Sequence, residues 1–396
     1  MGRWTDKYVI GLTGNIAMGK SLVRQMLQHL GAYPLDADGL AHQVMAPNAP
    51  AYKPVVETFG RFVLTPQGQI DRNKLGAVAF SHAEALQALE RITHPIISAA
   101  IDTLISRAKH KVIVVEAIKL LETDLIGYVD AIWVVDCSPQ LQLQRLMKRG
   151  LSQAEAIKRI QVQNPQTDKL ARANVVINNN GTPEEVWGQV QKAWSALAQG
   201  KADSAAAEQV RTVQVKTQTG TAQAVGAGAG QRMAISSLAI KRPRPHDFDK
   251  LVKVINIVTK RNTTRGDIMA AFGEKSYLMA EANDQAVGVI AFLVENLVTR
   301  VDEFIIHPQV SLSSVGKPLI EAMEKASHDL QSEIAFVFLP TQATDKKRVF
   351  MDAGYEEVKV EEIRIPAWRE AVTDSRPPET VVLSKRLREK LILKPI

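Results

Sequence analysis

The sequence predicts two folded domains, an α/β domain built on a parallel sheet and, after it, an α+β domain. In the first 200 residues the β-branched runs YVIGL, VIVVEA, AIWVVD and VVIN alternate with helical stretches, which is typical of a parallel sheet covered by helices. Further along, YLMAEA, AVGVIAFLVE and RVDEFIIHP predict an antiparallel meander, followed by a helix at 313–330 and the strand IAFVFLP. A length of 396 residues, at about 150 residues per domain, agrees with this division.

A flexible linker is predicted at residues 201–230. This segment contains no proline and no aromatic residue, and 20 of its 30 positions are Ala, Gly, Thr or Gln. Such a composition cannot bury a core and is typical of a flexible connection. We therefore expect one domain at 1–200 and the other at 231–396.

Composition excludes several classes of protein. The single cysteine, Cys137, rules out an internal disulfide and a cysteine-based metal cluster, which favours a reducing compartment. No uncharged apolar run reaches the roughly 18 residues that span a bilayer, and the first residues lack a secretory signal pattern. The net charge of +7 is spread along the chain rather than gathered in one arm. We expect a cytoplasmic protein with small anionic partners, and neither a nucleic-acid nor a membrane partner.

The strongest motif is GNIAMGKS at 14–21, which matches the phosphate-loop pattern G-x-x-x-x-G-K-[ST]. A strand pattern precedes the motif, and a helix pattern follows it and ends at Gly31. The apolar stripe of this helix consists of Leu22, Met26, Leu27 and Leu30. Strand, loop and helix therefore occur in the order that a nucleotide-binding loop requires.

In such a loop, successive backbone N–H groups and the helix N-terminus face the phosphates of a nucleotide. Lys20 is expected to contact the β- and γ-phosphates, and Ser21 to hold Mg²⁺ through its hydroxyl group. The candidate nucleotide-binding residues are Gly14, Asn15, Ile16, Ala17, Met18, Gly19, Lys20, Ser21 and Leu22.

A pair of carboxylates follows the next extended segment, in the sequence D-A-D-G at 36–39. The carboxyl end of a strand in a parallel sheet is where ligands bind. Because alternate residues of an extended segment point to opposite sides, we expect Asp36 and Asp38 to have different roles, one as a helix N-cap and the other facing the nucleotide.

A series of blocks resembles one family closely over residues 8–198. The blocks are VIGLTGNIAMGKS, LGAYPLDADGLAHQV, RITHP, VEAIKLLE, WVVDCSPQLQLQRLMKR and ANVVINNNG, in that order. They are similar to dephospho-CoA kinase. The resemblance implies a P-loop kinase fold with a helical lid, and transfer of the γ-phosphoryl group of ATP, with Mg²⁺, to the ribose 3′-hydroxyl of dephospho-CoA. In this family the reaction is the final step of coenzyme A biosynthesis.

The resemblance also assigns roles to residues. Asp38 matches the catalytic aspartate, the candidate base for the 3′-hydroxyl, and Lys20 the phosphate-loop lysine. Arg145 matches the lid arginine, which brings a positive charge onto the transferring phosphoryl group. Arg149 lies four residues on, as a further lid cation or as a solvated surface charge.

The lid and the last turn of this domain carry helix-start signals. Ser152 and Glu155 form a capping box that predicts a helix from 153, ended by Pro165. A second capping box is predicted at 182–185. The resemblance places the turn 178–181 near the adenine end of ATP, and a plain turn that caps the final helix is the alternative.

Several positions depart from the family pattern. Met18 is larger than the usual Gly or Ser and is expected to narrow the site, and E-A-I-K-L-L-E at 116–122 replaces D-x-P-L-L-x-E. Glu116 follows an apolar strand as a Walker-B-like acid does, so a supporting role at Mg²⁺ and a purely structural role both stay open. His94 matches a family position near the acceptor, with a packed turn residue as the alternative.

The order of elements in residues 232–396 resembles the GNAT acetyltransferase fold. That family binds the pyrophosphate of acetyl-CoA at a glycine-rich turn before a helix, and the matching turn here, 311–317, has Ser314 at a glycine position. Phe350, four residues before Gly354, replaces the tyrosine that acts as general acid, and phenylalanine cannot donate a proton. We therefore expect an inactive or CoA-sensing module that takes CoA or acetyl-CoA.

Two rival functions belong to other classes. In one, the chain is an ATP- or CoA-sensing binding protein whose acetyltransferase-like module recruits a partner. In the other, it is an acetyltransferase with an accessory kinase fold. Of the three hypotheses, an ATP-dependent kinase accounts for the largest number of motifs.

Overall fold

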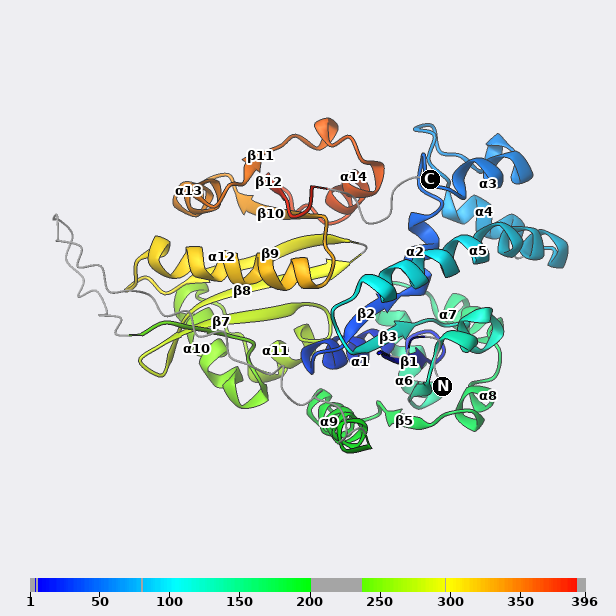
Figure 1. Ribbon diagram of the computed structural model, residues 1–396, viewed down its shortest axis with the longest axis horizontal. Coiled ribbons are helices and arrows are strands. Elements are labelled where there is room, and N and C mark those ends of the chain that lie inside the picture. Colours follow the sequence, from blue (N-terminus) through cyan, green and yellow to red (C-terminus); the bar gives the residue numbers. More distant parts are fainter. Residues whose placement is uncertain (1–3, 5, 80, 201–236, 296, 390–396) are drawn as a thin grey trace. The chain divides into compact units, whose positions relative to one another are not determined.

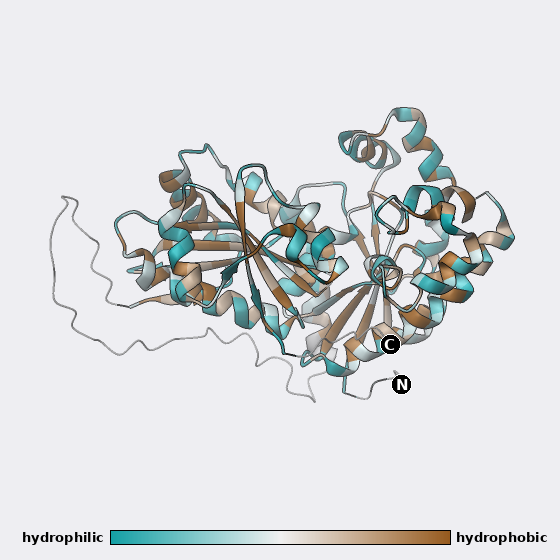
Figure 2. Cartoon of the chain, turned by 90° about the horizontal axis from the view of Figure 1, so that it is seen from above, coloured by the Kyte–Doolittle hydropathy of each residue, from teal (hydrophilic) through white to brown (hydrophobic). Residues whose placement is uncertain are grey.

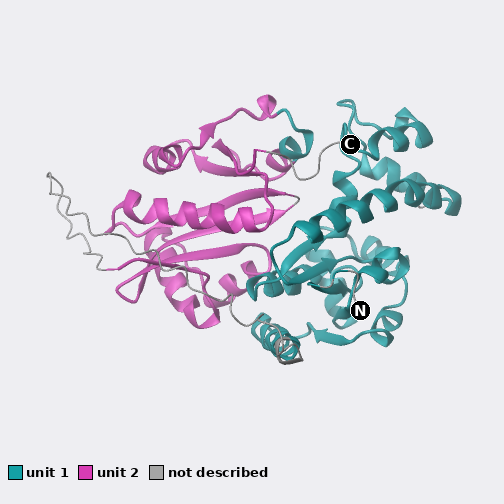
Figure 3. Cartoon of the chain, in the orientation of Figure 1, with its two compact units in different colours: residues 1–202, 364–370, 390–396 teal, residues 203–363, 371–389 magenta. Residues whose placement is uncertain are grey.

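The computed structural model describes residues 4, 6–79, 81–200, 237–295 and 297–389. The described chain divides into two compact units (Figure 3). The first unit runs to residue 200 and includes 364–370, and the second contains 237–363 and 371–389. The expected linker at 201–230 lies outside the described residues.

A five-stranded parallel sheet forms the centre of the first unit, as the sequence predicts. Its strands are β1 (Tyr8–Thr13), β2 (Tyr33–Asp36), β3 (Val112–Glu116), β4 (Ala131–Asp136) and β5 (Val175–Asn178). Their spatial order is β2-β3-β1-β4-β5. Figure 1 labels β1, β2, β3 and β5 of this sheet. All four neighbouring pairs are parallel, so the carboxyl ends of the strands meet at one edge.

Helices connect these strands. They are α1 (Lys20–His29), α2 (Ala37–Gln43), α3 (Tyr52–Phe59), α4 (Arg72–Ala79), α5 (Ala83–Arg107), α6 (Pro139–Lys148), α7 (Gln153–Gln161), α8 (Gln166–Ala171) and α9 (Pro183–Gly200). The apolar stripe of α1 buries Val23, Met26 and Leu27. Gly31, at φ 107°, follows the helix, and the Ala32 amide closes it on the Leu27 carbonyl at 2.9 Å. The expected helix end is confirmed.

The lid consists of α6, α7 and α8. Both halves of the expected Ser152–Glu155 capping box are present at the start of α7. The expectation that Pro165 ends this helix is wrong. The last turn of α7 closes at Gln161, and Pro165 stands instead before α8. Of the residues in α7, Ala156 is buried, while Ile157 and the following Val162 are exposed, so little apolar surface holds this helix.

The second unit is an α+β domain built on a mixed seven-stranded sheet. Its strands are β6 (Ala239–Lys241), β7 (Ser276–Ala282), β8 (Gln285–Glu295), β9 (Val298–Ile306), β10 (Ile334–Pro340), β11 (Glu356–Glu357) and β12 (Thr380–Arg386). The expected meander is confirmed, because β7, β8 and β9 pair antiparallel in chain order. Among the described strands of this seven-stranded sheet, only the pair of β9 and β10 is parallel.

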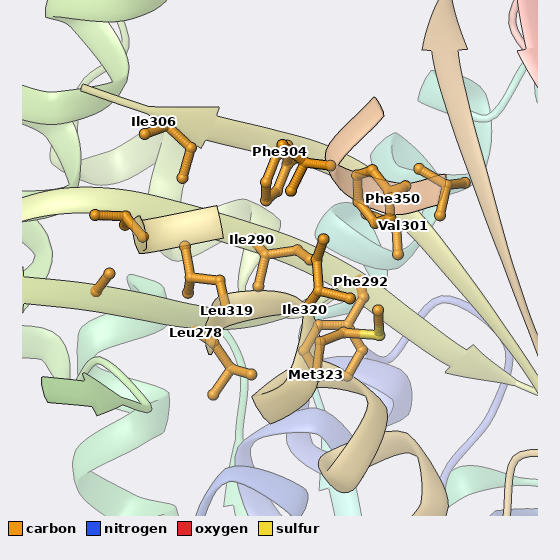
Figure 4. Packing of buried hydrophobic residues seen from close by; sticks show 14 of the residues in the cluster. Leu278, Ile290, Phe292, Val301, Phe304, Ile306, Leu319, Ile320, Met323 and Phe350 are labelled. Atoms are coloured by element: carbon orange, nitrogen blue, oxygen red, sulfur yellow. The ribbon is translucent and has the colours of Figure 1, made fainter. Parts of the chain in front are cut away.

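Helix α12 (Leu312–Asp329) covers this sheet, close to the predicted range of 313–330. Leu319, Ile320 and Met323 of α12 pack against strand residues such as Ile290 and Phe304 to form the core of the unit (Figure 4). Further α-helices are α10 (Phe248–Thr259), α11 (Arg265–Ala271) and α13 (Thr344–Asp352), and α14 (Pro366–Thr373), of which residues 366–370 belong to the first unit.

Hydropathy follows this architecture. The strands of both sheets are predominantly hydrophobic, whereas many helices show hydrophilic and hydrophobic faces (Figure 2). Among the described helices, none is both long enough and apolar enough to cross a bilayer.

Candidate functional site

The phosphate loop joins β1 to α1 at the carboxyl edge of the parallel sheet. Gly14 and Gly19 adopt φ angles of 144° and 99°, which L side chains rarely adopt. Lys20, at the first position of α1, is buried, and its Nζ donates to the Asn15 carbonyl at 3.4 Å. Burial lowers the pKa of Lys20, while the negative charges of Glu116, Asp38 and Asp36 act in the opposite direction. The loop therefore places a buried lysine where the charges of three carboxylates act on it.

Side chains from outside the loop bind its carbonyl oxygens. Gln142 Nε2 donates to the Ile16 carbonyl at 2.9 Å. Arg145 Nη1 donates to the carbonyls of Ala17 and Met18, each at 3.2 Å. Asn179 Nδ2 donates to the Met18 carbonyl at 2.8 Å. Because these carbonyls already have donors, the peptide groups of the loop are fixed before a nucleotide arrives, which is the preorganisation that anion binding requires.

Glutamine side chains just before α8 and at its first position accept hydrogen bonds from two amides of the loop. The Asn15 amide donates to Gln166 Oε1 at 3.0 Å, and the Ile16 amide donates to Gln163 Oε1 at 2.9 Å. The Asn15 side chain in turn donates to the Asn164 carbonyl at 3.0 Å. The end of the lid is therefore bonded directly to the loop.

Glu116, at the end of β3, contacts two residues of α1. It accepts a hydrogen bond from the Ser21 hydroxyl at 3.3 Å, and Arg24 Nε lies 2.6 Å from its second oxygen. Burial raises the pKa of Glu116, and the Arg24 and Lys20 charges oppose that shift. The hydroxyl and carboxylate oxygens here are of the kind that Mg²⁺ prefers. Both interpretations of Glu116 are thus compatible with its contacts.

Asp36 and Asp38 have different contacts, as expected from their spacing. Asp36 is the N-cap of α2 and accepts from the Gly39 amide at 2.9 Å. Asp38 Oδ2 accepts from the Ile118 amide at 3.2 Å, and more than a third of the residue surface reaches solvent. Partial burial of the carboxylate, followed by the charge of Asp36, raises the pKa of Asp38 to about 6. A carboxyl group with this pKa can accept a proton near neutral pH.

The structure also gives the positions of three further features that the sequence analysis singled out: Arg149, the capping box at 182–185 and His94. Arg149 is exposed at the end of α6. The second capping box is confirmed, since the Thr182 amide donates to Glu185 Oε2 at 3.1 Å and the Glu185 amide donates to Thr182 Oγ1 at 3.3 Å. His94 does not lie in a turn, because α5 continues through it and through Pro95.

The sequence analysis missed several residues of this site. Gln142, Gln163 and Gln166 bind the loop, and Lys169 is a buried lysine on α8. The spacing of three residues between Gln142 and Arg145, which places both on one face of a helix, is a signal that would have linked them. Glutamines in lid segments carry no recognisable motif, so only the folded chain brings them to the loop.

The expected turn of the second unit forms the start of α12. Ser311 caps this helix and accepts from the Ser314 amide at 3.3 Å. Phe350 is fully buried, with its ring 4.9 Å from that of Phe304 and 5.2 Å from that of Tyr355, measured between centroids. Phe350 is therefore a core residue of this unit.

Comparison with known proteins identifies relatives. The family model for dephospho-CoA kinase matches residues 8–185. The chain is 41% identical over 191 residues to the dephospho-CoA kinase of Geobacter sulfurreducens, which covers 47% of this chain and 97% of that protein. Among solved structures, TT1252 from Thermus thermophilus is 30% identical, with a TM-score of 0.44 over 49% of this chain and 98% of its own. A GNAT acetyltransferase from Staphylococcus aureus Mu50 is 10% identical, with a TM-score of 0.32 over 38% of this chain and 100% of its own. The chain belongs to the dephospho-CoA kinase family.

Proposed function

We propose that Asp38, Lys20 and the phosphate loop carry out the reaction of this family, the phosphorylation of the ribose 3′-hydroxyl of dephospho-CoA by ATP to give CoA and ADP. Lys20 and the loop amides bind the triphosphate, and Asp38 takes the proton of the attacking hydroxyl group. Phosphoryl transfer depends mainly on alignment and on neutralising charge, which matches a site made of fixed amides and one accessible carboxylate.

The observation that carries this proposal is the placement of Asp38. Its charge acts on Lys20, so the two groups share one site, yet Asp38 stays partly open to solvent and to an incoming substrate. Asp36 is occupied by the Gly39 amide and Glu116 by Ser21 and Arg24. Of these three carboxylates, Asp38 is the most accessible to a sugar hydroxyl group.

The residues present also suit Mg²⁺. We propose that Ser21 holds the ion through its hydroxyl group, together with phosphate oxygens, and that Glu116 orients Ser21 through their hydrogen bond. The ion supplies neutralisation of the phosphate charges when bound. Arg145 is proposed to act on the loop and, when a nucleotide is bound, on the transferring phosphoryl group.

The proposed reaction is tested by assaying CoA formation from ATP, Mg²⁺ and dephospho-CoA. We expect product from the full chain and from residues 1–200 alone, because every residue named in these roles lies in that range. Activity that requires residues beyond 200 would contradict the proposed domain boundary. The proposed compartment is the cytoplasm, which agrees with a free, buried Cys137.

We infer further that the second unit binds CoA without transferring an acetyl group. Phe350 has no proton to give and is packed in the core, which supports the loss of transfer. The N–H groups in the first turn of α12 that the Ser311 side chain does not occupy support the binding of an anion. Calorimetry of the full chain should find two CoA molecules bound per chain. After Lys317→Glu it should find only one, because this substitution replaces a positive charge with a negative one in the first turns of α12. Thioester loss from acetyl-CoA with an amine acceptor would contradict this inference.

A further inference from the structure

A buried lysine close to the phosphate loop has no role in the reaction as described so far. Lys169 lies on α8, and only 3% of its side chain is exposed. Its Nζ lies 3.3 Å from Glu122 Oε1, whose side chain is 28% exposed. A buried ammonium group is costly unless it is paired, so Lys169 depends on Glu122 while no other anion is present.

The position of α8 directs Lys169 toward the loop. Gln166, three residues earlier on the same helix, accepts from the Asn15 amide and donates to Asp136 Oδ1 at 3.1 Å. Residues three apart share one face of a helix, so Lys169 projects from the loop-facing side of α8. Lys20 contacts the same residue of the loop, through the Asn15 carbonyl.

The two lysine charges are close enough to interact. The positive charge of Lys169 contributes to lowering the pKa of Lys20. Two like charges held near each other in a poorly solvated site repel one another, and the carboxylates of Glu116, Asp38 and Glu122 offset this repulsion in the nucleotide-free protein. The terminal phosphate of a polyphosphate is an anion that can pair with both lysines at once. An ion pair between Lys169 and Glu122 with a purely structural role would not require Lys169 to lie near Lys20.

We propose that Lys169 is a second phosphate-binding lysine, which contacts the terminal phosphate of ATP together with Lys20. Glu122 holds it in the nucleotide-free protein and releases it when the triphosphate binds. This inference rests on the proposed use of the phosphate loop for ATP. It adds a catalytic residue on α8, the last helix of the lid, so closing the lid and completing the charge around the phosphoryl group become one event.

The test compares ATP with ADP, because only ATP has the terminal phosphate. Binding of both nucleotides to the full chain is measured by calorimetry for the wild type, Lys169→Met, Lys169→Arg and Glu122→Gln. We expect Lys169→Met to lower the affinity for ATP about tenfold or more, and to change the affinity for ADP by about twofold or less. Lys169→Arg should keep most of the preference for ATP, and Glu122→Gln should leave ATP binding equal or tighter.

Lys158→Met removes an exposed lysine from α7 and is the matched control, expected to bind both nucleotides as the wild type does. Equal weakening of ATP and ADP by Lys169→Met would overturn the proposal. A loss of ATP affinity in Glu122→Gln as large as in Lys169→Met would also overturn it, since the pair would then be structural. If Lys169→Met does not fold, the arginine and glutamine variants carry the same comparison. Because no dephospho-CoA is present, the result does not depend on whether CoA is formed.

Discussion

The carboxylate of Asp36 helps to raise the pKa of Asp38, two residues further along the chain. Asp36 is held as the N-cap of α2, so its charge stays close to Asp38. One carboxylate thus fixes the backbone while it adjusts the basicity of the other. This relation yields a prediction about pH.

CoA formation should lose activity below about pH 6, because Asp38 must be ionised to accept a proton. A plot of log kcat/KM against pH should rise with a slope of one toward pH 6 and then level off. The pH dependence of folding stability has the opposite sign. A carboxyl group whose pKa is raised on folding favours the folded state when it is protonated. The contribution of Asp38 to the free energy of unfolding is therefore lost as the pH rises from about 4 through 6. Asp36→Asn should move the acid limb of the activity profile to lower pH, and an unmoved limb would contradict the coupling.

Lys20→Ala should reduce both ATP binding and turnover, because the lysine charge meets the phosphates in the ground state and in the transition state. ATP affinity is measured by calorimetry and turnover by CoA formation, with the exposed Lys158→Ala as control. Retained turnover would mean that the loop has been misassigned.

Arg145→Ala should lower kcat more than it lowers ATP affinity if the guanidinium reaches the transferring group in the closed lid. Arg145 also bonds the carbonyls of Ala17, Met18 and Asn179. The same variant should therefore increase the hydrogen exchange of the loop amides. Arg145→Lys should rescue little, because one ammonium cannot replace a fork of donors. Equal losses of kcat and ATP affinity would place the arginine in ground-state recognition.

Gly19→Ala should destabilise the protein more than Gly31→Ala. Both glycines have positive φ angles, 99° and 107°, so each substitution carries a backbone cost of about 1–2 kcal/mol. A Cβ at Gly19 would also lie 1.9 Å from Asn179 Nδ2, whereas one at Gly31 would meet nothing within 4 Å. Urea unfolding measures the difference, and equal losses would show that Asn179 moves aside freely.

The sequence was sufficient for the parallel sheet, the strand–loop–helix order at 8–29, the capping boxes and the different contacts of Asp36 and Asp38. Each of these depends on local spacing, which a single chain displays directly. The meander of β7, β8 and β9 followed for the same reason, since alternation and turns are local.

The supports of the loop were not predictable in this way. Gln163 and Gln166 reach Ile16 and Asn15 across about 150 positions of sequence, and their side chains have no distinctive pattern. The proline signal predicts that Pro165 ends α7, whereas the helix ends at Gln161. In the structure the segment after Gln161 turns away from the helix, and Gln163 bonds to the loop.

The most direct measurement is turnover of ATP and dephospho-CoA by the wild type and by Asp38→Asn at pH 7.5, with ATP binding measured on the same samples. We predict that the wild type forms CoA, and that the amide variant is slower by roughly 10²–10⁴ while it binds ATP nearly as well. Wild-type rates in Asp38→Asn would contradict the account, because the proton of the sugar hydroxyl would then be removed by some other group.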